Sequence, residues 1–326
     1  MRAMHIRHRL AALACAFLLV AGCGGGKSDR HARFDTPQAA VDAFVDALEK
    51  NDQAALAKLL GPDIDGLLSS GDPVQDQSDR QRFLAAYAAK HSLEAQGDGT
   101  QVLVIGENDW PFPIPVVEHK GKWHLDGNAG ADELIYRRIG HNELGAIAVC
   151  RGFVGAQKDY ASQGHDGDPA GIYALKLISD EGTQNGLYWP TADSEPASPA
   201  GPFVAKAAEE GYRRSDTGPT PYHGYYYRML YAQGANAPGG ARDYFKGGVL
   251  TEGFALVAWP ADYGTSGVQT FIVSQDGTVY QKDLGEDTAS AANAILSFDP
   301  DPSWKPVPAG DVAAAAGAPT GAVSSN

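Results

Sequence analysis

The spacing of apolar residues predicts three helices near the start of the chain. The first begins where Thr36 can cap a helix and Pro37 suits its first turn, because a proline needs no backbone donor there. A second ends at Gly61-Pro62, and a third runs from Asp79 to His91. The apolar positions that recur at helical spacing in these segments are Ala40, Phe44, Ala47, Leu48, Ala54, Leu56, Leu59, Leu60, Phe83, Leu84 and Tyr87.

After these helices the apolar period changes from 3.6 to about 2, which predicts strands over 101–105, 116–118 and 122–125. A Lys120-Gly121 turn joins the last two into a hairpin. Between the first strand and this hairpin, prolines at 111, 113 and 115 alternate with Trp110, Phe112 and Ile114. Three prolines on one edge exclude a central strand, so this segment is an edge strand or an extended polyproline-like run. Two interpretations are open: the segment is a surface on which a partner docks, or it protects the edge of the sheet.

The second half of the chain predicts one long helix followed by a sheet. Apolar residues at helical spacing run from Ala131 to Tyr160, and the segment from there to Pro221 is rich in Gly, Pro, Ser and Asp, as in ordered loops with short helices. Strands follow over 225–231, 253–259, 268–273 and 278–282, with a short helix from Ala289 to Phe298. The expected fold class is α+β with two domains, over 34–128 and 129–307. In the second, the long helix packs on a four-stranded antiparallel sheet.

The N-terminus indicates export. A basic run from Met1 to Arg9 precedes the apolar stretch Leu10–Val20, which is too short for the roughly 20 residues of a membrane-spanning helix. The next residues, Val20-Ala-Gly-Cys23, resemble the lipobox of bacterial lipoproteins, in which the cysteine is lipidated. We therefore expect a signal peptide over 1–22, lipid on Cys23 and a flexible tether over 23–33, with a disordered tail over 308–326. Because Gly24 stands where an Asp retains some lipoproteins at the inner membrane, the expected location is the outer membrane, facing the periplasm.

The net charge and the cysteine content limit which partners and which covalent chemistry we expect. The formal net charge is −14, and losing Arg2, Arg7 and Arg9 with the signal brings it to −17, which disfavours nucleic acid. Loss of Cys15 and lipidation of Cys23 would leave Cys150 as the single free thiol, so no internal disulfide can form. Cys150 lies in the long helical pattern, where a small buried hydrophobe is expected rather than a nucleophile.

Several short segments stand out together. They are Trp110-Pro-Phe-Pro-Ile-Pro115, Arg137-Arg-Ile-Gly-His-Asn-Glu-Leu144, Pro221-Tyr-His-Gly-Tyr-Tyr226, Ala237-Pro-Gly-Gly240, Gly253-Phe-Ala-Leu256 and Tyr263-Gly-Thr-Ser-Gly267. Taken together, they resemble an uncharacterised bacterial envelope family, domain of unknown function 2950, over about Phe34 to Val307. This resemblance implies no known activity.

Each half also resembles a known fold. The first looks like the nuclear-transport-factor-two-like fold, which often holds a pocket. Its candidate lining residues are Asp109, Trp110, Trp123 and His124, although core packing explains the tryptophans equally well. The second is similar to pilin and pseudopilin domains. It has Arg137, Arg138 and His141 where a true pilin has an apolar half-helix, which argues against insertion into a pilus.

Two segments carry candidate chemistry in the second half. One has Tyr222, His223, Tyr225, Tyr227 and Arg228, where tyrosines could bind sugar or peptide and His223 could act as acid or base. The same alternation suits a half-buried strand. In the other, the pair Asp166 and Asp168 is either a weak Ca²⁺ site or a solvated turn.

No catalytic motif of the nucleophile-elbow, zinc-helix or phosphate-loop kind is present. The sequence therefore predicts an envelope lipoprotein that binds or assembles with an envelope protein or glycan, at a membrane reached through its lipid anchor. One alternative is a hydrolase or lyase with a cleft near His223. Another is a small-ligand pocket in the first domain.

Overall fold

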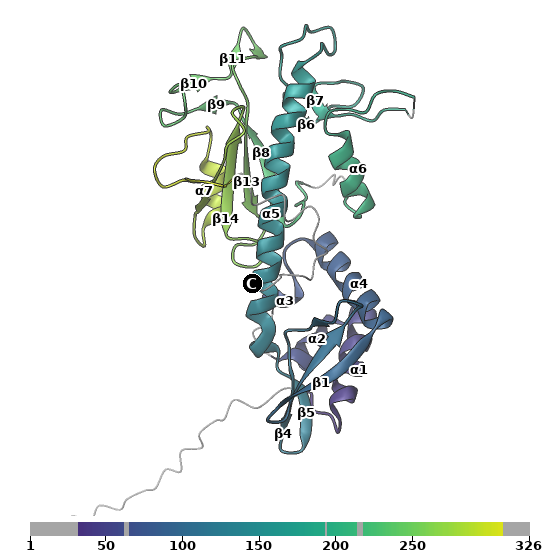
Figure 1. The fold of residues 1–326 in the computed structure, drawn as a ribbon. Coiled ribbons are helices and arrows are strands. Elements are labelled where there is room, and N and C mark those ends of the chain that lie inside the picture. The colour runs from purple at the N-terminus through teal and green to yellow at the C-terminus, as the bar shows by residue number, and fades with distance from the viewer. Residues whose placement is uncertain (1–31, 62–64, 193, 214–217, 309–326) are drawn as a thin grey trace, which may run out of the picture. The chain divides into compact units, whose positions relative to one another are not determined.

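The computed structural model describes residues 32–61, 65–192, 194–213 and 218–308. The signal peptide, Cys23, the tether up to residue 31 and the tail from residue 309 lie outside the described residues, so those assignments stay predictions. The α+β class is confirmed, because the described residues form helices together with several antiparallel sheets (Figure 1). Among them, no helix combines the length and the apolar character that crossing a bilayer requires.

Four helices open the fold. The first prediction holds in detail, because the Thr36 hydroxyl accepts a hydrogen bond from the Ala39 N–H at 3.1 Å, at the start of α1. The third predicted helix was placed too late: it begins at Pro73, where Asp72 caps it by accepting from the N–H groups of Val74 and Gln75. The helices are α1 (Pro37–Glu49), α2 (Gln53–Leu60), α3 (Asp65–Leu68) and α4 (Pro73–Ala89).

An antiparallel sheet follows, with strand order β1-β2-β4-β5 and β3 paired to β2. The predicted hairpin is confirmed: Lys120 and Gly121 both have positive φ, 54° and 73°, as a tight two-residue turn requires. The proline-rich segment contributes one short strand, and its Phe112 and Ile114 side chains are buried. The strands are β1 (His91–Gly97), β2 (Thr100–Ile105), β3 (Trp110–Pro111), β4 (Val116–His119) and β5 (Lys122–Leu125); β1 was not predicted.

Apolar side chains of the helices and this sheet form one hydrophobic cluster. At its centre the rings of Phe44, Phe83 and Phe112 contact one another, with centroid separations of 5.1 to 5.7 Å. Edge-on and tilted contacts of this kind add to the burial of the rings. The helical and strand patterns of the sequence therefore meet in one core.

The long helix α5 (Gly127–Ala161) packs on a second antiparallel sheet, of order β16-β15-β14-β13-β8 (Figure 1). Four of its strands match the predicted ones. The fifth, β16, was missed because two residues that include a proline give no strand pattern. The strands are β8 (Tyr225–Leu230), β13 (Ala255–Pro260), β14 (Gln269–Ser274), β15 (Val279–Asp283) and β16 (Lys305–Pro306).

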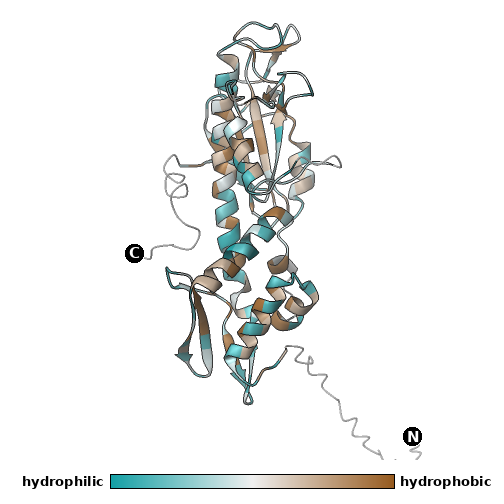
Figure 2. Ribbon diagram, turned by 90° about the vertical axis from the view of Figure 1, so that its right-hand side faces the viewer, coloured by the Kyte–Doolittle hydropathy of each residue, from teal (hydrophilic) through white to brown (hydrophobic). Residues whose placement is uncertain are grey.

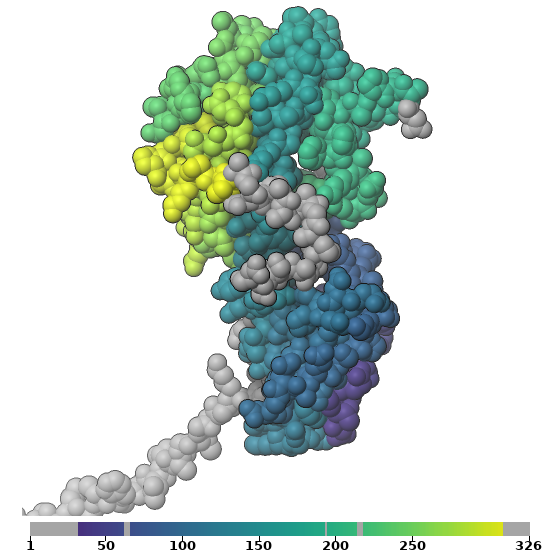
Figure 3. Space-filling view, viewed as in Figure 1, coloured from purple at the N-terminus to yellow at the C-terminus, as the bar shows by residue number. Residues whose placement is uncertain are grey.

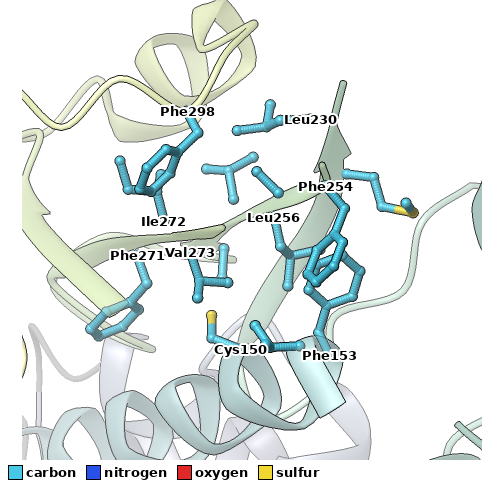
Figure 4. Packing of buried hydrophobic residues seen from close by; sticks show 14 of the residues in the cluster. Cys150, Phe153, Leu230, Phe254, Leu256, Phe271, Ile272, Val273 and Phe298 are labelled. Carbon is cyan, nitrogen blue, oxygen red and sulfur yellow. The ribbon is translucent and has the colours of Figure 1, made fainter. Parts of the chain in front are cut away.

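The core between α5 and this sheet explains Cys150. Figure 4 shows its sulfur pointing from α5 toward Phe271 and Val273, which lie on β14. The thiol is fully buried, and burial raises its pKa to about 12. The prediction of a small buried hydrophobe is thus confirmed. Figure 2 shows teal and brown segments in alternation along α5, in keeping with a helix that has one buried side.

The remaining elements are short. β6 and β7 pair in parallel. Two antiparallel two-stranded ribbons, β9–β10 and β11–β12, lie in the chain between β8 and β13. The predicted domain limits of 34–128 and 129–307 stay predictions. The bounds are β6 (Lys176–Ile178), β7 (Gly186–Tyr188), α6 (Gly201–Glu209), β9 (Ala232–Gln233), β10 (Arg242–Asp243), β11 (Phe245–Lys246), β12 (Val249–Leu250) and α7 (Thr288–Ala294).

Candidate functional site

The predicted aromatic segment on β8 is mostly part of the fold. Tyr225 is fully buried, and its hydroxyl donates to the Gln269 carbonyl at 2.9 Å. The Tyr227 hydroxyl donates to the Tyr222 carbonyl at 3.3 Å. These positions fit the packing interpretation of the two tyrosines better than a ligand surface.

Arg228 also has a structural role. Its guanidinium donates to the carbonyls of Ala292 and Ile295, at 2.9 and 2.8 Å, where α7 ends. Cations are favourable at helix C-termini, because the last carbonyls lack partners within the helix. Of the predicted aromatic segment over 222–228, Tyr222 and His223, which precede β8, remain as candidate ligand-binding residues.

His223 lies beside a carboxylate. Its Nε2 atom is 3.0 Å from Oε2 of Glu210, and the two side chains are 15% and 30% exposed. His223 adopts a φ of 51°, in the left-handed region that few residues other than glycine occupy. The edge of the Tyr222 ring contacts the imidazole at a centroid distance of 4.2 Å.

A buried carboxylate holds the backbone at this position. Asp72 is fully buried, and its Oδ2 accepts from the Tyr212 hydroxyl at 2.8 Å and from the Gly224 N–H at 2.9 Å. The Tyr212 oxygen in turn accepts from the His223 N–H at 3.2 Å. A buried charge is tolerated only when it is fully hydrogen-bonded, and these donors, with the α4 cap, satisfy Asp72. The cap of α4 thus fixes the turn that presents His223.

The second nitrogen of His223 faces α5. Within the described residues Nδ1 is buried and has no hydrogen-bond partner, and a methyl group at Gly145 would lie 3.5 Å from it. Burial lowers the pKa of His223, against the opposing effect of Glu210. The ring of His141 lies 6.1 Å away, and burial followed by the charge of His223 lowers its pKa too. Both imidazoles are therefore held toward their neutral forms.

This geometry limits what His223 can do. A general base must reach the proton that it removes, within about 3 Å or through one water. With Nε2 on Glu210 and Nδ1 enclosed against α5, neither nitrogen is presented to a substrate. The His223–Glu210 pair instead joins the end of α6 to the turn before β8.

A ligand-sized hollow lies elsewhere, at the end of β13. It has a volume of about 560 Å³, within the range typical of small-molecule sites. The Tyr263 hydroxyl donates to the Asp283 carboxylate at 3.0 Å, which fixes the ring. The lining combines apolar surface with carboxylates and hydroxyls, from Pro260, Ala261, Asp262, Tyr263, Gly264, Glu286, Thr288 and Ala289.

The predicted pocket residues of the first half line neither the hollow at the end of β13 nor a second, smaller hollow over α1 and α2. Trp110 packs on Phe112 and beneath the Arg137 guanidinium, at 6.0 and 5.5 Å. Trp123 and His124 are half-buried in β5, where the Trp123 backbone pairs with Phe34. The second hollow, of about 300 Å³, lies over α1 and α2. Its lining is Ala32, Ala43, Asp46, Ala47, Lys50, Asp52, Ala55, Lys58 and Leu59.

The predicted calcium pair sits in a tight turn. Asp166 has a φ of 51°, and its carboxylate accepts from the Gln184 N–H at 2.6 Å. Asp168 is exposed, and its N–H donates to the His165 carbonyl at 2.8 Å. In the described part of the chain, no group of three or more His, Cys, Asp or Glu side chains is arranged to hold a metal ion.

Sequence reasoning missed three residues of the His223 site and the whole hollow. Asp72 had a readable signal, since Asp before Pro marks a helix start. Glu210 and Tyr212 had none, because their partners lie 13 and 140 positions away. Of the hollow's lining, only the phrase from Tyr263 to Gly267 had been singled out, without a role.

Comparison with known proteins adds one finding. A family model described as "Protein of unknown function (DUF2950)" matches residues 31–307. No curated protein and no solved structure matches the chain. Function must therefore be argued from the residues themselves.

Proposed function

The chain belongs to the DUF2950 family of proteins of unknown function, and from this premise we propose that it is a lipid-anchored binding protein of the bacterial envelope. The observation that carries the binding role is the 560 Å³ hollow at the end of β13. Its size suits a small molecule or the end of a larger partner. The oriented Tyr263 ring offers a stacking face, and Asp262 and Glu286 offer carboxylates.

The anchor is proposed from the lipobox-like Val20-Ala-Gly-Cys23. Each buried methylene contributes on the order of 0.8 kcal/mol, so several acyl chains on one cysteine would hold the body durably at a bilayer. We place it at the outer membrane, facing the periplasm, with residues 23–33 as the tether. On this account the first half has a nuclear-transport-factor-two-like fold and the second a pilin-like fold. The helix on an antiparallel sheet supports the latter.

A substitution that fills the hollow tests the binding role. Ala289 lies in the lining and is exposed, so Ala289→Trp puts an indole into the hollow without disturbing the core. Ala294→Trp is the matched control, since Ala294 is an exposed alanine of the same helix that lies outside the lining. Each purified protein is incubated with a small-molecule extract of the envelope, and the retained compounds are identified by mass spectrometry.

We expect wild type and Ala294→Trp to retain the same compounds and Ala289→Trp to lose them. Equal retention by all three proteins would place binding elsewhere. Retention of nothing by wild type would contradict a small-molecule role for the hollow.

A second candidate is a hydrolase or lyase at His223, favoured by the 3.0 Å separation of its Nε2 from Glu210. The enclosed Nδ1 argues against it. Chromogenic ester, peptide and glycoside substrates separate the two candidates. Turnover that disappears in His223→Ala, with the fold retained, would favour the enzyme; the binding role predicts no such turnover.

A further inference from the structure

Helix α6 is held on its neighbours by few groups. None of its residues is buried, and Phe203, its largest apolar side chain, is 40% exposed. The Phe203 ring lies against the backbone of α5 at Gly152, where a methyl group would be only 2.1 Å from its Cζ atom. Figure 3 shows α6 at the surface, beside α5. Helices with little buried area open at low free energy, so α6 depends on specific contacts.

At the C-terminal end of α6, Glu210 contacts His223 and is also hydrogen-bonded to the titratable side chain of Tyr222. Glu210 is the residue after the last helical position, and its carboxylate meets Nε2 of His223 at 3.0 Å. Lys206, one turn earlier, is 3.9 Å from the same carboxylate. Two residues beyond, Tyr212 is held by Asp72. The end of α6 is thus fixed to the turn before β8 through a titratable side chain.

Protonation of His223 does not fit this arrangement. A carboxylate only accepts, so Nε2 carries the proton in the neutral ring and Nδ1 keeps a lone pair. That lone pair is enclosed against Gly145, without a partner among the described residues. A second proton would therefore become a buried donor with no acceptor, which is costly. The charge of Glu210 attracts the protonated ring, but burial opposes it more strongly, so the ring gains by turning toward water, and it then leaves Glu210.

We propose that His223 and Glu210 form an acid-sensitive latch, which holds the C-terminal end of α6 on the turn before β8 at neutral pH and releases it when His223 is protonated. Release frees this end of α6, whereas Phe203 lies near the other end of the helix, against Gly152 of α5. This role rests on the proposed function: an envelope protein that faces the periplasm meets external acid, so the latch would couple external pH to the position of α6.

The surrounding charges act in both directions. Glu210 and Asp72 favour protonated His223, and Lys206 opposes it. On α5, His141 is the titratable neighbour, and it faces Arg82 and Asp79 of α4 as well as Glu210. The burial of His223 outweighs the carboxylates, so its pKa lies below the ordinary value. The closed latch is therefore the state that binds fewer protons.

Hydrogen exchange of the full-length protein at pH 7.5 and pH 5.0, corrected for intrinsic rates, tests the latch. We expect the amides of α6 to lose protection by about tenfold at pH 5.0, because acid favours the released state, which binds more protons. His223→Gln keeps a side-chain donor near Glu210 and does not titrate, so its α6 should be protected equally at both pH values. His141→Gln is the matched control and should keep the wild-type response.

Unchanged α6 protection in the wild type at pH 5.0 would overturn the proposal. So would an undiminished pH response in His223→Gln. If that variant fails to fold, the wild-type protein decides alone. The midpoint of α6 release must then coincide with the His223 midpoint measured by NMR; coincidence with the His141 midpoint instead would refute the latch.

Discussion

The hydroxyl of Tyr212 donates a 2.8 Å hydrogen bond to the carboxylate of Asp72, a residue 140 positions earlier in the chain. The same carboxylate accepts from Gly224 and caps α4. One buried aspartate therefore joins three segments: the start of α4, the residues after α6 and the turn before β8. The residue that caps α4, Asp72, therefore also holds the backbone around His223 in place.

Asp72→Asn should destabilise the protein substantially. An asparagine amide keeps one acceptor oxygen and turns a donor toward other donors, so we expect a loss of about 3 kcal/mol in the free energy of unfolding. Tyr212→Phe removes one bond and should cost about 1 to 2 kcal/mol. Urea unfolding measures both. If the double variant loses the full sum of the single losses, Asp72 and Tyr212 are not coupled and the assignment fails.

Gly152→Ala should displace α6. The added methyl group would lie 2.1 Å from the Phe203 ring, so the ring and the helix that carries it must move. Gly155→Ala is the control on the same helix: nothing lies within 4 Å of a methyl group there, and alanine favours a helix over glycine by about 1 kcal/mol. We expect faster hydrogen exchange in α6 for the first variant only. Equal exchange in both variants would show that Phe203 does not rest on Gly152.

The sequence predicts the parts of this fold that local patterns encode. Thr36 and Pro37 predicted the start of α1, and the alternation of apolar residues predicted β8, β13, β14 and β15 to within two residues at most ends. The polar strand β1, with nearly every side chain exposed, has no such pattern, and it forms because β2 pairs with it. Burial of Tyr225 and the end-of-helix role of Arg228 also depend on contacts with distant residues, which periodicity does not encode.

Acid should destabilise the folded state. Burial, as the largest cause, lowers the folded-state pKa of both His141 and His223 below the ordinary value near 6.5. Between the lowered and the ordinary pKa the unfolded chain binds more protons, so stability rises with pH there and is flat above about pH 7. Below about pH 6.5 stability should therefore fall. Urea midpoints from pH 8 to pH 5 measure this, and His141→Gln with His223→Gln should flatten the curve; an unflattened curve would assign the effect to other groups.

Cys150 should resist alkylation in the native protein. Its thiol is fully buried with a pKa of about 12, so almost no thiolate exists at neutral pH and none of it is accessible. With iodoacetamide at pH 8, we expect modification of Cys150 only after urea is added. Rapid labelling without denaturant, at the rate of a free cysteine, would show that the core between α5 and the second sheet opens readily.

The proposed function depends most on the lipid at Cys23, since a binding protein of the envelope needs an anchor there. Intact mass spectrometry of the protein extracted from membranes with detergent tests this directly, with Cys23→Ser as the comparison. We predict a wild-type polypeptide that begins at residue 23 and carries the added mass of acyl chains, and a Cys23→Ser protein that lacks that mass and leaves the membrane fraction. An unmodified wild-type chain, or one that begins at any other residue, would contradict the account.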